Sequence, residues 1–230
     1  MSKLVPPHGG KGLVCSLLEG AAREAELKKA AGLKKVEISP RVRGDLIMMG
    51  IGGFSPLNGF MTKADWKSVC EKFSLSDGTF WPVPVILDAS KEEAGAFKEG
   101  DEIALVYKGD IYATMKVTEK YSLTADEKKW ECEKIFKGQG AESADDKFWK
   151  IAEAEHPGVK MVMEQKEFNL AGPVKVLSEG RYPKDYAGTY MRPAELRAAL
   201  DKRAKALVAL KVPRQRVQHL RHAHRALVKD

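Results

Sequence analysis

The sequence predicts an α+β fold in which the strand-rich first part is barrel-like and carries interspersed helices. Of the 230 residues, 43% are hydrophobic, which is enough for a substantial core. Two β-rich runs meet at Lys108-Gly109-Asp110, and apolar residues with helical spacing lie on both sides of this pair. No apolar run reaches the roughly 18 residues that a membrane span needs, and the N-terminus lacks the apolar block of a signal peptide. We therefore expect a cytoplasmic protein that does not bind membranes.

The first elements follow from spacing and turn residues. Apolar positions from Gly12 to Lys29 recur with helical spacing and predict a first helix, and "KKVEIS" after it predicts a strand. Thr62 stands three residues before Asp65, which is the spacing of a capping pair for the helix "KADWKSVCEKF". In "LSDGTFWPVPVILD" we expect a turn at Asp77-Gly78 and then a strand at a sheet edge or bulge, since it contains two prolines.

The later elements are read in the same way. Asp101–Val117 predicts the clearest hairpin, and charged helices are expected at about Ala125–Lys137 and Ala144–Ala154. The segments "GVKMVM" and "GPVKVL" have the composition of strands. Next comes the helix "MRPAELRAALDKR", with Pro193 in its first turn, and then "ALVAL", Ala206–Leu210, as a fully apolar strand. A helix, an apolar strand and a polar loop in this order are typical of the start of a parallel α/β sheet.

Charge and cysteine content narrow the function classes. The formal net charge is +7, and residues 201–230 alone carry nine Lys and Arg against two Asp, so residues 1–200 are balanced. These balanced residues show no stripe of alternating basic and aromatic side chains, which argues against nucleic acid as the partner. The three cysteines are far apart and have no metal-site spacing, so we expect reduced, partly buried thiols.

The stretch "IMMGIGGFSPLNGFM", Ile47–Met61, has no charged residue and contains four glycines. Its backbone could cradle an anion or press against another domain. The interpretation that we favour is that the glycines form tight turns while Phe54, Leu57 and Phe60 fill the core. On this interpretation the stretch lacks charge because it is buried.

Several long motifs together resemble one family. "MMGIGGFSPLNGFM", a short helix and "LSDGTFWPVPVILD" are similar to the amino-terminal domain of sulfate adenylyltransferase (ATP sulfurylase), and "KEFNLAGPVKVL" with "MRPAELRAAL" resembles the exit of that domain. The resemblance covers about Lys35 to Leu210, and the start "LVPPHGGKGLVC" resembles the enzymes of dissimilatory sulfate reducers.

The resemblance implies both a fold and a reaction. It implies a PUA-like, β-barrel-type domain over residues 1–175, followed over residues 176–230 by a linker and the helix and first strand of a Rossmann-like α/β nucleotidyltransferase domain. In the implied reaction, sulfate attacks the α-phosphate of ATP, which is bound with Mg²⁺, and adenosine 5'-phosphosulfate and pyrophosphate are formed. The partners would be ATP and sulfate, and a homo-oligomer is expected.

Family site residues are carried over to the tail "VPRQRVQHLRHAHRALVKD". The family motif Q-x-R-N-x-x-H, followed by a second histidine, is not present as such, because these residue types occur here with shifted spacing. By resemblance His219 and His222 would be catalytic. The expected substrate-binding residues are Gln215, Arg216, Arg221 and His224. The histidine spacings of three and two could also suit a metal, and a solvated basic tail is the simplest alternative, so no metal site is assigned.

Two function classes stay open at this point. The first is an enzyme, a sulfate adenylyltransferase polypeptide that is incomplete by itself, because the sequence ends twenty residues after the expected strand. The second is a non-catalytic PUA-like binding module whose basic tail contacts RNA or an intact sulfurylase subunit. If the charge of the tail recruits RNA, only weak, non-specific binding that falls steeply with salt is expected, whereas a salt-insensitive, sequence-selective complex would favour the module.

Overall fold

A computed structural model of the chain describes residues 4–136 and 156–209. The chain divides into two compact units, a larger one of Pro7–Tyr190 and a smaller one of Met1–Pro6 with Met191–Asp230. The helix expected at Ala144–Ala154 lies outside the described residues. The border expected after residue 175 stays a prediction.

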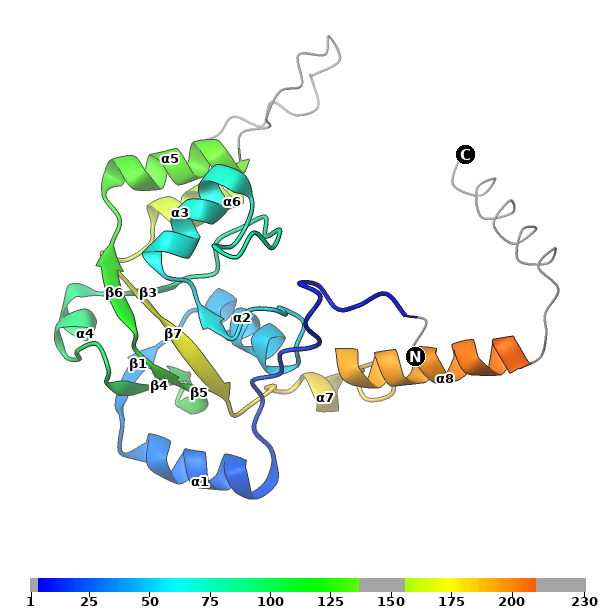
Figure 1. The fold of residues 1–230 in the computed structure, drawn as a ribbon. Coiled ribbons are helices and arrows are strands. Elements are labelled where there is room, and N and C mark those ends of the chain that lie inside the picture. The colour runs from blue at the N-terminus through cyan, green and yellow to red at the C-terminus, as the bar shows by residue number, and fades with distance from the viewer. Residues whose placement is uncertain (1–3, 137–155, 210–230) are drawn as a thin grey trace, which may run out of the picture. The chain divides into compact units, whose positions relative to one another are not determined.

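Within the described residues of the larger unit, seven strands form one mixed sheet (Figure 1). The main path runs β1-β4-β5-β7-β2, and β3 and β6 also pair with β7. The pair β1 and β4 is parallel, and the other pairs are antiparallel. The strands are β1 (Lys34–Glu37), β2 (Gly59–Phe60), β3 (Leu87–Ala89), β4 (Glu102–Tyr107), β5 (Asp110–Lys116), β6 (Glu119–Ser122) and β7 (Phe168–Val176).

The long strand β7 holds the sheet together. Its first residues pair with β3 and β6, and its last residues pair with β2 and β5. Where these two halves meet, Gly172 has φ +149°, and a Cβ at this position would collide with the carbonyl oxygen of Lys116. A Cβ at Gly59 on β2 would likewise collide with the carbonyl oxygen of Gly172. Glycine is therefore required at both positions for the strands to approach each other.

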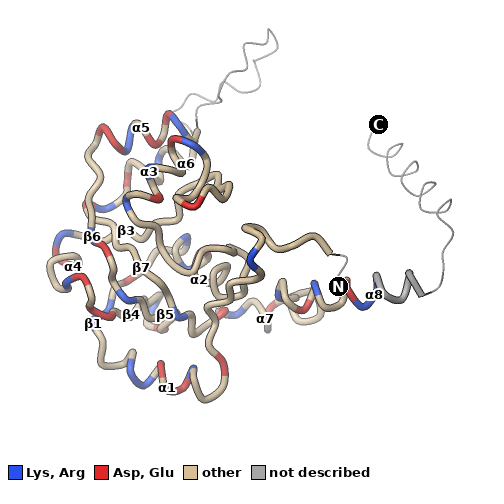
Figure 2. The backbone as a smooth tube through the Cα atoms, in the orientation of Figure 1, with Lys and Arg blue, Asp and Glu red and all other residues tan. Residues whose placement is uncertain are grey.

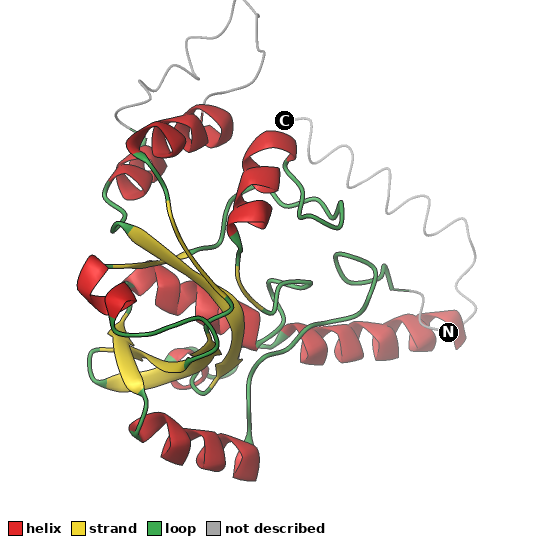
Figure 3. Cartoon of the chain, turned by 60° about the vertical axis from the view of Figure 1, so that its left-hand side comes forward, coloured by secondary structure: helices red, strands yellow, loops and turns green. Residues whose placement is uncertain are grey.

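The helices lie around this sheet, as Figure 3 shows. In the larger unit they are α1 (Gly20–Ala31), α2 (Pro40–Gly50), α3 (Lys63–Lys72), α4 (Lys91–Gly95), α5 (Ala125–Phe136), α6 (Pro157–Met163) and α7 (Tyr182–Asp185). Buried side chains from helices and strands form an extended apolar core, and a second, smaller cluster consists of Ala30, Ala104, Val106 and Leu177. The largest fully buried side chains of the extended core include Trp66, Leu46, Met49, Leu87, Ile103 and Leu105. Each such side chain stabilises the fold by roughly 1.5–3 kcal/mol relative to an exposed position.

Several predicted elements are confirmed. Thr62 caps α3 by accepting a 3.1 Å hydrogen bond from the backbone N–H of Asp65. The hairpin of β4 and β5 turns at Lys108 and Gly109, whose φ values of 50° and 87° match the left-handed turn that right-twisted strands favour. The strand "KKVEIS", the helix after Thr124 and the strand "GPVKVL" also form as expected.

The predicted start of the first helix is wrong. Helix α1 begins at Gly20, and the residues before it run extended. The backbone N–H groups of Ser16 and Leu17 donate to the carbonyls of Met49 and Gly50 at the end of α2, and Leu18 N donates to Val176 O on β7. These long-range hydrogen bonds hold the residues before Gly20, called the arm below, in an extended conformation. The helical spacing of their apolar side chains did not indicate this conformation.

Two predicted strands also differ from the structure. "GVKMVM" belongs to helix α6, which starts with Pro157 in its first turn and with His156 Nδ1 accepting from the N–H of Gly158. Its composition suggested a strand, but the cap and the proline determine a helix. In "LSDGTFWPVPVILD" only Leu87–Ala89 forms a strand, because two prolines interrupt the earlier residues.

The smaller unit contains helix α8 (Pro193–Ala209). Pro193 is its first residue, as predicted, and the backbone N–H of Arg192 donates to Glu195 Oε2 at 2.8 Å. The strand predicted at Ala206–Leu210 is wrong for Ala206–Ala209, because the helix continues through them, and Leu210 lies outside the described residues. Alanine and leucine are strong helix formers and no glycine or proline interrupts the helix, so this short apolar run was ambiguous from sequence.

Charged residues of both signs are interspersed along the larger unit, as Figure 2 shows. This distribution agrees with the balance of charge over residues 1–200. None of the helices among the described residues is long and apolar enough to cross a membrane.

Candidate functional site

The six site residues predicted from the resemblance lie outside the described residues. They are Gln215, Arg216, His219, Arg221, His222 and His224. Their roles therefore stay predictions. Over residues 4–136 and 156–209, no three His, Cys, Asp or Glu side chains are grouped so that they could hold a metal ion.

The segment that leads from the sheet toward α8 is fixed at its start by α1 and β5. Leu177 follows directly after β7, donates its N–H to Tyr112 O at 2.7 Å and accepts a 2.7 Å hydrogen bond from Arg23 Nε. Further along, the hydroxyl of Tyr190 donates to Glu179 Oε1 at 2.7 Å. The end of the larger unit is thus held by specific polar contacts.

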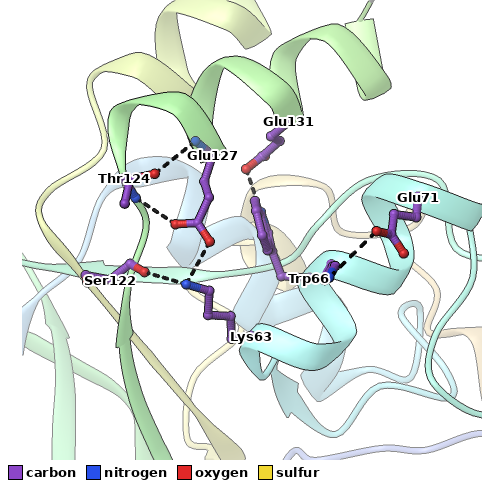
Figure 4. A network of polar contacts seen from close by, with 8 residues as sticks. Lys63, Trp66, Glu71, Ser122, Thr124, Glu127 and Glu131 are labelled. Carbon is purple, nitrogen blue, oxygen red and sulfur yellow. Dashed lines mark hydrogen bonds and ion pairs between the residues drawn. The ribbon is translucent and has the colours of Figure 1, made fainter.

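A buried polar contact joins α3 and α5 (Figure 4). Trp66 donates its indole N–H to Glu131 Oε2 at 2.7 Å, and the ring of Trp66 lies 5.6 Å from that of Trp130. Glu131 is only 3% exposed. Burial raises the pKa of its carboxyl, although the hydrogen bond from Trp66 and the charges of Arg41 and Lys128 act in the opposite direction.

A second set of contacts in Figure 4 ties the start of α5 to α3. Lys63 Nζ lies 2.8 Å from Glu127 Oε1 and donates to Ser122 O at 3.2 Å. Glu127 also accepts from the N–H of Thr124, whose hydroxyl accepts in turn from the N–H of Glu127. The hydrogen bonds from Lys63 and Thr124 lower the pKa of the Glu127 carboxyl. All these groups are therefore engaged in holding the two helices together.

The titratable groups next to this contact are not poised for chemistry. Burial, followed by the charges of Glu131 and Glu71, raises the pKa of the Cys70 thiol. Burial and the charge of Glu119 raise the pKa of the Tyr121 hydroxyl, which donates to Met61 O at 3.2 Å. A thiol and a phenol that stay protonated in a closed interior are structural groups. The polar contacts between α3 and α5 thus stabilise the fold and form no catalytic site.

A third polar cluster attaches α1 to the sheet. The carboxylate of Glu26, on α1, accepts a 2.7 Å hydrogen bond from the Thr114 hydroxyl and a 3.1 Å one from Lys175 Nζ, and Lys29 Nζ lies 3.7 Å away. Burial raises the pKa of Glu26, but these hydrogen bonds and lysine charges outweigh it and lower the pKa overall. The cluster therefore fixes α1 against β5 and β7.

The charge-free stretch Ile47–Met61 serves packing. Phe60 is buried, and Phe54 and Leu57 pack against the core as expected. Gly52 has φ +83°, and Cys15 Sγ would lie 2.8 Å from a Cβ there. The hydroxyl of Ser55, in the same stretch, accepts a 2.8 Å hydrogen bond from the N–H of Val14. The arm before Gly20 therefore covers this stretch. Sequence reasoning missed this role because Val14 and Ser55 are about forty residues apart.

Comparison with known proteins gives this scaffold a family. The sequence profile of the PUA-like domain family matches residues 5–179. Over 209 residues the chain is 66% identical to a sulfate adenylyltransferase of Desulfovibrio desulfuricans. This match covers 91% of this chain and 49% of the relative. The chain is 65% identical over 205 residues to that of Desulfatibacillum aliphaticivorans (88% and 48%) and 46% identical over 216 residues to that of Entamoeba histolytica (92% and 48%).

A solved structure supports the fold alone. The hexameric APS kinase from Thiobacillus denitrificans matches with a TM-score of 0.61 at 24% identity, over 88% of this chain and 32% of that one. The chain spans about half the length of the curated relatives that it matches. The resemblance to sulfate adenylyltransferases drawn from the sequence motifs is confirmed by these relatives. This chain belongs to the PUA-like domain family and, over nine-tenths of its length, is similar to sulfate adenylyltransferase enzymes.

Proposed function

We propose that this chain acts in sulfate activation as part of a sulfate adenylyltransferase, in which ATP and sulfate give adenosine 5'-phosphosulfate and pyrophosphate. The observation that carries the proposal is the 66% identity over 209 residues to a protein of that name. Identity at this level over 91% of this chain supports a common role.

In the proposed reaction sulfate attacks the α-phosphate of ATP directly and pyrophosphate leaves. Such a transfer needs no enzyme nucleophile, because cations and hydrogen-bond donors stabilise the charge that develops on the phosphoryl oxygens. His219 and His222 are proposed to contact the reacting groups. Gln215, Arg216, Arg221 and His224 are proposed to bind the anionic substrates, since arginine forks match phosphate and sulfate oxygens.

Magnesium enters this proposal as the ion bound to ATP. Among the residues that the structure describes, no three His, Cys, Asp or Glu side chains are grouped so that they could hold a metal ion. Magnesium bound to ATP phosphates neutralises part of their charge.

A pyrophosphate-release assay with ATP, Mg²⁺ and sulfate tests the proposed roles of the tail. We expect little turnover from the 230-residue chain by itself, because the residue types of the family motif occur here with shifted spacing. A catalytic group that is misplaced by about 1 Å can reduce the rate roughly a hundredfold. If sulfate-dependent turnover is measurable, His219→Ala and His222→Ala should each abolish it, whereas Lys229→Ala should not. Equal activity of all four proteins would refute the assigned roles.

A chimera tests the proposed function independently of the tail. Residues 4–209 replace the matching segment of the Desulfovibrio desulfuricans relative, and adenosine 5'-phosphosulfate formation is measured. We expect activity within about tenfold of the parent, because 66% of the residues in the match are identical. A folded but inactive chimera would argue that this chain has lost the enzymatic role. Light scattering on the 230-residue chain checks the proposed homo-oligomer.

The alternative is a non-catalytic PUA-like binding module in the cytoplasm. The observation that favours it is the concentration of the whole net charge of +7 in residues 201–230. Binding to RNA through this segment should weaken steeply with salt and vanish when residues 211–230 are removed. Salt-insensitive binding, or binding that survives this deletion, would count against the tail as the contact.

A further inference from the structure

Asn169, in β7, is a buried polar residue whose side chain has no partner among the described residues. Its exposed fraction is 0%. Both Nδ2 and Oδ1 are closed to solvent and lack a hydrogen bond within residues 4–136 and 156–209. It differs in this from Thr114, Glu26 and Glu131, which are buried too but hold hydrogen bonds.

The neighbours of Asn169 in the sheet are polar but already engaged. Asp88 on β3 and Tyr121 on β6 stand directly opposite it in the two ladders. Side chains of directly opposite residues share one face of a sheet, with Cβ atoms about 4.5–5.5 Å apart. Asp88 Oδ2 accepts from the N–H of Lys166 at 3.1 Å, and the Tyr121 hydroxyl donates to Met61 O at 3.2 Å.

Residues next to Asn169 are themselves buried. Tyr121 is 7% exposed and Leu170, the next residue of β7, is fully buried. An apolar side chain of similar size, such as leucine, would avoid the loss of hydration that a buried amide suffers here.

Buried amides in proteins are almost always satisfied, by protein or by an ordered water molecule. An enclosed water forms about three hydrogen bonds to buried polar groups that otherwise lack partners. The carboxamide carries an N–H₂ donor group and a carbonyl acceptor on the same carbon, which suits a small ligand that both donates and accepts.

We propose that Asn169 binds an enclosed water molecule in the interior of the larger unit, beside Asp88 and Tyr121. This water completes the hydrogen bonds of the carboxamide where β3 and β6 meet β7. It is a structural ligand that explains why an asparagine occupies a core position.

The composition of the chain makes the test direct. The sequence contains only two asparagines, Asn58 and Asn169, so selective ¹⁵N labelling of asparagine gives two side-chain amide signals. Asn58 is exposed and serves as the internal control. The variant Asn58→Ser assigns the two signals. In the full chain, the Asn169 amide should show a nuclear Overhauser effect to water with the sign of a long-lived contact, whereas Asn58 should show only contact with bulk solvent.

A second measurement counts the bound water. The amplitude of ¹⁷O relaxation dispersion should fall by the contribution of one long-lived water in Asn169→Leu and stay unchanged in Asn58→Leu. A missing Overhauser effect at Asn169 in the wild-type protein would overturn the proposal. So would an unchanged dispersion amplitude in folded Asn169→Leu. If that variant does not fold, the wild-type spectrum alone decides.

Discussion

Trp66 and Glu131 share a 2.7 Å hydrogen bond inside the protein, between α3 and α5. Trp66→Phe removes the donor and leaves a buried carboxylate without its partner. We expect the free energy of unfolding to fall by about 1–3 kcal/mol, as for other buried groups that lose a hydrogen bond. Urea denaturation measures this difference. Glu133→Gln, at an exposed position of the same helix, is the control and should change little; an equal loss in both variants would contradict the assignment.

Gly172→Ala tests the crossing of strands at the middle of β7. Alanine would have to adopt φ +149° and place its Cβ against the Lys116 carbonyl. We expect a loss of about 3 kcal/mol or more, or failure to fold. Gly188→Ala is the matched control, because Gly188 also has positive φ, +89°, but its Cβ would meet nothing within 4 Å. This control should lose only about 1 kcal/mol, and similar losses in both would show that strand contact is unimportant.

Asp45, on α2, makes stability depend on pH. Burial raises the pKa of its carboxyl to about 6, and Arg41, 4.0 Å away, only partly opposes this. Because the unfolded pKa is roughly 3.9, the folded state favours the protonated form. Its contribution is present below about pH 4 and is lost as pH rises to about 6, by roughly 3 kcal/mol in total.

The variant Asp45→Asn isolates this effect from other carboxyls. It should unfold with a higher midpoint than the wild type at pH 8 and with nearly the same midpoint at pH 4. Denaturant titrations at several pH values measure the difference. Asp110→Asn, at the exposed hairpin turn, should show no such divergence. A constant difference between Asp45→Asn and wild type across this range would sink the prediction.

Cys15 should be the one thiol that reacts in the folded protein. It is exposed, whereas Cys70 and Cys132 are buried. Burial also raises the pKa of the Cys70 thiol, which removes the reactive thiolate. Mass spectrometry after maleimide treatment should show one label on the native protein and three after unfolding. Labelling of Cys15→Ser in the native state would contradict this.

Local signals predicted the parts of the fold that local contacts determine. The turn residues Lys108 and Gly109 determined the hairpin, and the spacing of Thr62 and Asp65 determined the start of α3. Both rely on backbone conformation and capping within a few residues, which sequence displays directly.

Long-range contacts determine the parts that were missed. The arm before Gly20 is extended because its N–H groups bond to α2 and β7, far away in sequence. Its apolar spacing suited a helix equally well. Likewise, nothing in the stretch around Asn169 distinguished a buried carboxamide from a surface one. The predicted site residues beyond residue 209 depended on family resemblance alone, because their spacing departs from the motif.

The position of β7 in the chain also bears on how the protein is made. This strand pairs with β2, β3, β5 and β6, all of which precede it on the chain. During synthesis, these four strands leave the ribosome before their common partner and present unpaired edges. The sheet can therefore close only after Val176 has emerged, and a nascent chain that stalls before Phe168 remains open to aggregation or chaperone capture.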